Sequence, residues 1–109
     1  MKSAPDHLTK ETRKWVNHVI NNFDLQPRHE KLLVLAAEAL DRSIEARDLI
    51  NRDGLMLVDR FEQKKLNPLV NVERDSRLAF CRILRELQLD DIEAPEAARI
   101  PVLYKGLGG

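Results

Sequence analysis

A helical pattern that runs without interruption from Pro27 to Asp53 limits what this chain can fold into more than any other feature. Proline is favoured at the first position of a helix, and Gly54 stands where a left-handed C-terminal cap belongs. A helix of this length spans about 40 Å, because each residue advances about 1.5 Å. We therefore predict one long helix as the central element of the fold.

The predicted long helix is apolar on more than one side, so it must be covered on two sides. One stripe consists of Leu33, Ala36, Leu40 and Ile44, and Leu32, Leu35, Ala39, Leu49 and Ile50 widen it. A first helix can cover one side as an antiparallel hairpin, which leaves the other side for a third helix or a neighbouring subunit. We take the first stripe as candidate oligomer contacts.

The first helix is predicted from Thr9, which can cap it, to about Asn22, before a break that ends at Pro27. Its apolar stripe consists of Trp15, Val16, Val19, Ile20 and Phe23. Lys10, Arg13 and Lys14 gather at its start and form a candidate phosphate-contacting patch. The alternative is a solvated helix end, since cations in the first turns oppose the helix dipole. Residues 1–8 show no periodicity and are predicted to form a mobile arm.

A third helix is predicted from Asn67 to Leu89, with Asn67 as N-cap and Pro68 at the first helical position. Its apolar residues recur at spacings of three and four: Leu69, Val72, Ala79, Phe80, Ile83, Leu84 and Leu87. Four pairs at i,i+4 can support the two longer helices by a few tenths of a kcal/mol each. They are Glu73–Arg77, Arg82–Glu86, Glu38–Arg42 and Asp48–Arg52.

The segment between the second and third helices is apolar first and basic afterwards. Leu55 to Val58 is predicted to be a short extended segment packed against the long helix. Arg60, Lys64 and Lys65 then make a basic loop, which either contacts a phosphate backbone or serves as a charged connector. Lys64 and Lys65 are therefore added to the candidate DNA-binding residues.

The chain after Leu89 is predicted to be an irregular tail, because Pro95, Pro101 and a glycine-rich finish oppose a helix. Residues 100–104 are apolar enough to add a short packed strand or to dock on another subunit or protein. The predicted organisation is an arm over residues 1–8, one helical oligomerisation domain over residues 9–91, and a tail over residues 92–109. The fold class is all-α.

Composition restricts the function classes. The 109 residues suffice for one small domain. The content of charged residues is high (33%) and that of aromatic residues is low (5%), which favours a helical protein with salt-bridged faces. The formal net charge is zero, so a single chain lacks the electrostatic footprint of a strong DNA-binding protein. DNA binding would have to sum a modest patch over many subunits. No apolar run is long enough to cross a bilayer, and a lone Cys81 is consistent with a reducing cytoplasm.

The sequence contains no recognisable catalytic or metal-binding motif. His7, His18 and His29 are scattered without partners at zinc-ligand spacing, and His18 is predicted to be a partly buried spectator. Cys81 has no base beside it, so a structural thiol is expected. No glycine-rich phosphate loop is present. We predict no enzymatic activity, no cofactor and no metal for this chain.

One run of residues resembles a known family. Asn67-Pro68, Glu73-Arg74-Asp75, Arg77, Phe80 and Leu84-Arg85-Glu86-Leu87 with Leu89 resemble the C-terminal signature of phage terminase small subunits. The likeness extends more loosely over residues 9–90, through Trp15, the Leu32–Leu40 run, Asp41-Arg42, Ala46-Arg47 and Gly54. The loop from Asp59 to Leu66 departs from it by lacking the glycine expected there, and little chain precedes Trp15 for a separate DNA-binding domain.

The resemblance implies a ring-forming subunit in the host cytoplasm that recognises the packaging site of viral double-stranded DNA. It implies a large terminase subunit as partner, which carries the ATPase and nuclease. Glu73, Arg74, Arg77, Phe80 and Arg85 are then assigned to contacts between subunits, because interleaved carboxylates would repel phosphate. One alternative is a helical adaptor or scaffold that binds only protein. A helix-turn-helix regulator is a weaker one, since the second helix is too long for a recognition helix.

Overall fold

The structure is a computed structural model that describes residues 1–87 of the chain. Its elements are α1 (Lys10–Asn22), α2 (Pro27–Asp53), β1 (Met56–Val58), β2 (Lys64–Leu66) and α3 (Leu69–Leu87). Helices make up 68% of these residues, so the predicted helical character is confirmed. The two-stranded sheet was not predicted. The expected continuation of the third helix to Leu89 and the tail over residues 92–109 lie outside the described residues.

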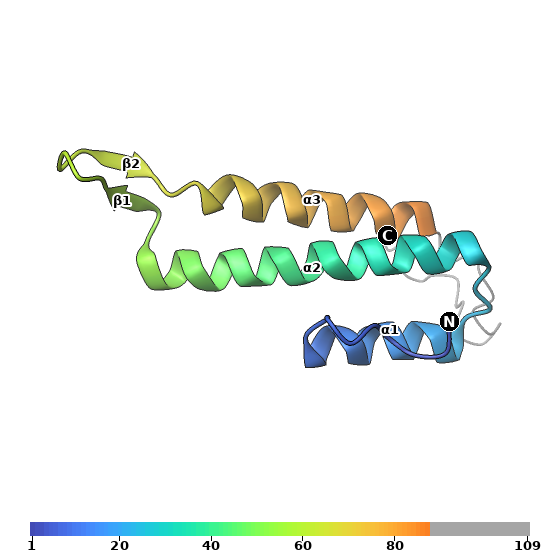
Figure 1. The fold of residues 1–109 in the computed structure, drawn as a ribbon. Coiled ribbons are helices and arrows are strands. Elements are labelled where there is room, and N and C mark those ends of the chain that lie inside the picture. The colour runs from blue at the N-terminus through green and yellow to red at the C-terminus, as the bar shows by residue number, and fades with distance from the viewer. Residues whose placement is uncertain (88–109) are drawn as a thin grey trace, which may run out of the picture.

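The helix α2 forms the axis of the molecule, with α3 antiparallel along one side and α1 along the other (Figure 1). The shorter α1 accompanies only the first half of α2, whereas α3 accompanies most of its length. The core lies where all three helices are present, and its fully buried members include Val16, Val19, Leu33 and Leu87. The second half of α2 therefore pairs with α3 alone, and the two strands project beyond it (Figure 1).

The N-terminal segment is packed rather than mobile. Ala4 and Leu8 are buried in the core, and the Ala4 N–H donates to Asn17 Oδ1 at 2.8 Å. The amino group of Met1 is bonded to Glu30 on α2. The sequence predicted a mobile arm because two isolated apolar residues have no helical period. The structure uses both of them to cover the side of α1 and α2.

The ends of α2 follow the predicted positions with one difference. The helix begins at Pro27, and the ring of the buried His29 accepts a hydrogen bond from the Gln26 N–H at 3.1 Å. Gly54 ends it, with φ 93° and ψ 167°. This is not the left-handed helical conformation that was expected. It is an extended region of positive φ that essentially only glycine adopts, so the residue type is explained.

Asn67 joins the hairpin to the helices. As predicted, its side-chain Oδ1 caps α3 by accepting from the Leu69 N–H at 3.0 Å. In addition, its Nδ2 donates to the Gly54 carbonyl at 3.0 Å, and its backbone N–H donates to the Leu55 carbonyl at 2.7 Å. The residue is only 2% exposed. Asn67 therefore fixes the start of α3 relative to the end of α2.

The segment Leu55–Val58 does not pack against α2, which corrects the prediction. Its residues in β1 pair antiparallel with β2, in the register Met56–Leu66, Leu57–Lys65 and Val58–Lys64. The pairing gives hydrogen-bond partners to backbone N–H and C=O groups that would otherwise have to bond to water or to side chains of α2. Met56 and Val58 remain exposed, as does Leu66 opposite Met56. We call residues 55–66 the hairpin.

The turn of the hairpin is built on Asp59. Its Oδ1 accepts from the N–H groups of Phe61 at 2.8 Å and Gln63 at 3.0 Å, which is the local bonding that favours Asp in turns. The Gln63 and Phe61 hydrogen bonds, helped by Lys65, lower the pKa of Asp59 against the opposing effect of burial. Glu62 has φ 61°. A glutamate thus adopts positive φ within the loop Asp59–Leu66, in which the family resemblance led us to expect a glycine.

Replacing Glu62 with glycine should stabilise the hairpin by about 1 kcal/mol, since a residue with a Cβ pays roughly that much to adopt positive φ. The added stability should appear as slower hydrogen exchange of the backbone amides at positions 59 and 62. These amides donate to the carbonyls of Gln63 and Asp59, each at 2.9 Å. Gln63→Gly is the matched control and should speed the same exchange. Faster exchange in Glu62→Gly would show that the positive φ of Glu62 does not cost the hairpin stability.

Candidate interaction surfaces

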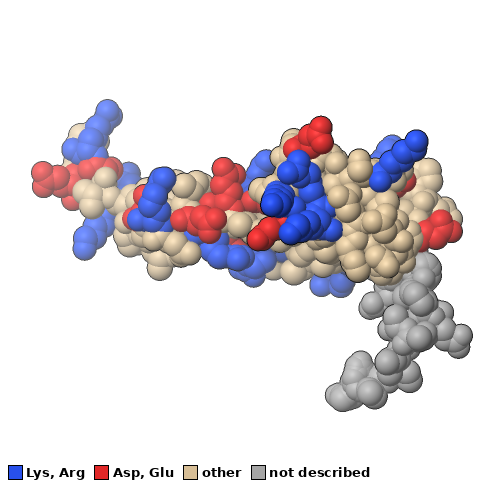
Figure 2. All heavy atoms as spheres, turned by 90° about the horizontal axis from the view of Figure 1, so that it is seen from below, with Lys and Arg blue, Asp and Glu red and all other residues tan. Residues whose placement is uncertain are grey.

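The predicted phosphate patch is formed by the first turns of α1. Lys10 and Lys14 are exposed and Arg13 is half-buried, and none of the three is in an ion pair with another residue of the range 1–87. Figure 2 shows basic side chains gathered over the start of α1, with acidic side chains beside them. We call Lys10, Arg13 and Lys14 the α1 patch.

The α1 patch is held in place by Asp41 of α2. The carboxylate accepts from the Thr9 N–H and hydroxyl, both at 2.8 Å, and from the Thr12 hydroxyl. Burial alone would raise the pKa of Asp41, but the hydrogen bonds from Thr12 and Thr9 outweigh burial and lower it. His7 binds Glu38 one turn earlier on α2, at 2.8 Å. The start of α1 is thus tied to the middle of α2.

Asp41→Asn should lower the free energy of unfolding by about 1 kcal/mol at pH 7, because hydrogen bonds to a charged acceptor are stronger than those to an amide. The lowered pKa means that the native state favours the ionised form. The stabilisation is therefore complete above the unfolded pKa of about 3.9 and is lost as the pH falls through the folded pKa. Urea unfolding at several pH values should show the variant and the original chain converging at acidic pH. A constant difference down to pH 2 would contradict the role of Asp41.

The hairpin lysines lie apart from the α1 patch. Lys64 and Lys65 belong to β2, beyond the end of α2, whereas α1 begins beside the middle of α2 (Figure 1). Lys65 is also ion-paired with Asp59 at 3.5 Å. The structure therefore divides the predicted DNA-binding residues into two separate groups, of which the α1 patch is the larger.

The apolar stripe predicted for oligomer contacts serves largely inside one chain. Leu33 and Ala36 are fully buried, while Leu40 and Ile44 are half-buried. Leu33 belongs to the same core cluster as residues of α1 and α3. Leu33 and Ala36 therefore have no surface left for a second copy, which corrects their assignment. The periodicity was interpreted correctly, but it cannot tell an intrachain partner from an intersubunit one.

The charged residues of α3 are also engaged within the chain. Glu73 lies between Arg47 of α2, at 3.3 Å, and Arg77, at 3.1 Å, so the predicted Glu73–Arg77 pair is confirmed. These two arginines lower the pKa of Glu73 although partial burial acts in the opposite direction. Arg74 contacts the adjacent Asp75 at 3.3 Å. A link between α2 and α3 therefore replaces part of the expected intersubunit network.

Two other assigned residues of α3 differ in their surroundings. Phe80 packs edge-on against Trp15 of α1, with ring centroids 5.7 Å apart. Arg85 is exposed and has no ion pair within residues 1–87. Within the same range, the pairs Arg82–Glu86, Glu38–Arg42 and Asp48–Arg52 do not form. Of the proposed intersubunit residues in α3, Arg85 is the most available.

The histidines and the cysteine take part in local contacts only. His18 is exposed and bonded to Asn22, which corrects its predicted partial burial. Cys81 is exposed and free. Across residues 1–87, no three His, Cys, Asp or Glu side chains come together as a metal site would require. No described helix combines the length and apolarity needed to span a membrane.

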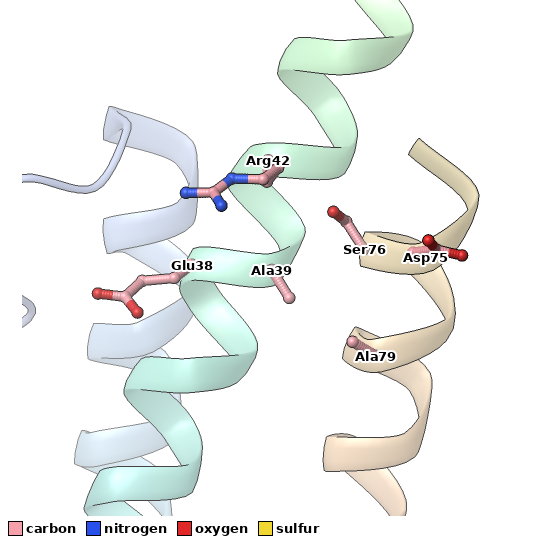
Figure 3. Close-up of a pocket in the computed structure, with 6 residues that line it drawn as sticks. All are labelled: Glu38, Ala39, Arg42, Asp75, Ser76 and Ala79. Carbon is pink, nitrogen blue, oxygen red and sulfur yellow. The ribbon is translucent and has the colours of Figure 1, made fainter. Parts of the chain in front are cut away.

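Two further surfaces have no counterpart among the interaction surfaces predicted from the sequence. One is a groove along the junction of α2 and α3, where Ala39, Ser76 and Ala79 point into the space between the helices (Figure 3). It continues toward the hairpin beside Leu49, Leu69 and Val72. We call the whole depression the seam groove. The other is the exposed hairpin itself. The small residues on facing helices were the available signal for the groove.

Comparisons with known proteins do not identify the chain. No family model matches it, and no similar curated protein or solved structure was found.

Proposed function

We propose that this chain is the small terminase subunit of a tailed phage. In this role it assembles into a ring, engages viral double-stranded DNA, and recruits and modulates the large subunit that carries the ATPase and nuclease. The chain itself has no catalytic role and uses no cofactor in this proposal. The resemblance of residues 67–89 to the small-subunit signature supplies the biological context.

The observation that supports DNA engagement is the α1 patch. Lys10, Arg13 and Lys14 have no ion pair within residues 1–87, while Asp41 immobilises the helix that carries them. Cations without carboxylate partners can neutralise phosphates and release counterions. A neutral chain binds DNA weakly through one such patch, but repetition around a ring multiplies the contacts. The assembly thereby reconciles zero net charge with DNA binding.

The test is the affinity for duplex DNA as a function of salt, measured by fluorescence anisotropy. Lys10→Glu/Lys14→Glu should abolish measurable binding at low salt. Lys10→Ala removes one cation per subunit, so it should reduce the slope of log affinity against log salt concentration by about one for each subunit that contacts the DNA. The matched control is Arg28→Glu/Lys31→Glu, which reverses two exposed cations at the start of α2. The control should retain most of the binding.

The DNA assignment is wrong if both double variants lose binding equally, because the effect would then reflect net charge alone. It is also wrong if the original chain ignores duplex DNA at low salt.

The second candidate is a helical adaptor or scaffold that binds only protein. The exposed apolar hairpin favours it, since Phe61 and Val58 are 69% and 64% exposed and exposed apolar groups mark protein contacts. This candidate predicts no response to DNA at low salt together with retained binding to a protein partner.

A further inference from the structure

The hairpin presents a preformed apolar face with nothing covering it among residues 1–87. Residues opposite one another in an antiparallel pair share a face, so Met56, Leu66 and Val58 lie on one side together with Lys64. All four are exposed. Phe61 stands at the turn with the Arg60 guanidinium over its ring, 5.1 Å from the centroid. A two-stranded ribbon of this kind is marginally stable without further packing.

The hairpin cannot fold back onto its own helices. Asn67 binds the carbonyls of Gly54 and Leu55 at the base of the ribbon and caps α3 at the same time. These bonds direct the strands away from the helical body, past the end of α2 (Figure 1). The helices of residues 1–87 therefore leave the hairpin uncovered.

The seam groove is partly apolar, as is the exposed face of the hairpin. Ala39, Ser76 and Ala79 leave space between α2 and α3 (Figure 3). Leu49, Leu69 and Val72 line its continuation toward the hairpin. α1 does not extend over the second half of α2, so this part of the helix pair lacks a third layer (Figure 1).

The hairpin and the seam groove are complementary in charge, and the groove is long enough to hold the paired strands. Glu38, Glu45 and Asp75 line the groove together with the cation Arg42. Glu38 also binds His7 and Asp75 binds Arg74, so Glu45 is the lining carboxylate without a partner in an ion pair within residues 1–87. The hairpin carries Arg60, Lys64 and Lys65 against Asp59 and Glu62, so it has one surplus positive charge. From Glu38 to Leu49 the groove runs about 17 Å along α2, whereas the three paired residues of each strand span only about 7 Å.

We propose that the hairpin of one copy lies in the seam groove of a second copy of this chain. Because the two surfaces differ, the contact is heterologous, and each copy offers one hairpin and one free groove. Repetition of that contact builds a ring or an open filament. This inference rests on the assembly in the proposed function and names the surfaces that make it, but it does not require DNA binding.

The test uses two variants of the full chain that each disable one surface. Val58→Asp places a carboxylate on the exposed hairpin face, and Ala79→Arg fills the groove. Light scattering coupled to size exclusion should find each variant alone as a monomer of 12.6 kDa. Mixed in equal amounts, they should form a heterodimer of twice that mass, since the mixture retains one intact hairpin and one intact groove. Far-ultraviolet circular dichroism verifies that both variants are folded.

The controls are Gln63→Ala, which changes an exposed side chain of the hairpin turn without altering its charge or its apolar face, and Asn71→Arg, which places arginine on an exposed position of α3. Both should assemble like the original chain. The proposal is overturned if the original chain is monomeric, if either disabling variant still assembles, or if the folded variants fail to pair on mixing. Loss of DNA binding in an intact assembly would instead overturn only the DNA function. A further outcome would also overturn the proposal. If the Ala79→Arg monomer binds DNA and the added substitution Val58→Asp abolishes that binding, the hairpin contacts DNA and not a second copy.

Discussion

Replacing Asn67 with alanine should lower the free energy of unfolding by about 3 kcal/mol, because it leaves two backbone groups without partners at a nearly fully buried position. The Leu69 N–H loses its cap, and the Gly54 carbonyl loses the Asn67 amide. Backbone groups buried without a partner each cost about 1–3 kcal/mol. Urea unfolding followed by circular dichroism measures the loss.

Two further substitutions make the Asn67 result specific. Asn67→Asp keeps an acceptor for the Leu69 N–H but removes the donor to Gly54, so its loss should be smaller than that of alanine. Asn71→Ala changes an exposed asparagine one helical turn further on and should alter stability by less than about 0.5 kcal/mol. Equal effects from Asn67→Ala and Asn71→Ala would show that the hydrogen bonds at the base of the hairpin contribute nothing.

Leu33→Ala should cost about 3 kcal/mol, since a fully buried leucine loses its transfer free energy and leaves a cavity. Leu33 belongs to the core cluster that includes Val16 and Val19 of α1 and Leu87 of α3. The destabilisation should therefore be independent of protein concentration. Chemical unfolding at two concentrations, one hundred-fold above the other, measures this.

Leu35→Ala is the matched control for Leu33, because Leu35 lies on the same helix but is 53% exposed. Its effect on stability should be less than about 1 kcal/mol. If the loss in Leu33→Ala grew as the protein was diluted, Leu33 would serve an intersubunit contact, contrary to its burial within one chain.

Much of the fold could be predicted from local signals. Pro27, Gly54 and the Asn67-Pro68 pair mark helix boundaries through backbone chemistry that depends on a few neighbouring residues. The apolar spacing in α1 and α3 identified residues such as Val16 and Leu87, which the structure buries completely. These features need no knowledge of distant parts of the chain.

What could not be predicted depends on pairing between distant segments. The periodicity of α2 marks Leu33 as buried but does not say whether α1, α3 or another subunit covers it. The hairpin was missed because its strands are short and its turn uses Glu62 instead of glycine. The ties from Asp41 to Thr9 and Thr12 join residues about thirty positions apart, for which no local pattern exists.

The burial of Leu33 changes where the assembly contacts must lie. A stripe enclosed within one chain cannot hold subunits together, so the contacts we propose use the hairpin and the seam groove. This also separates assembly from DNA engagement, which we assign to the α1 patch. Variants of one surface should therefore leave the other surface chemically intact.

The native mass of the full chain in solution, by light scattering coupled to size exclusion, is the most direct test of the proposed assembly. We predict one discrete species larger than a tetramer, which persists on dilution into the micromolar range. A monomer or dimer at every concentration would contradict the ring, the hairpin contact and the summation of weak phosphate contacts over subunits.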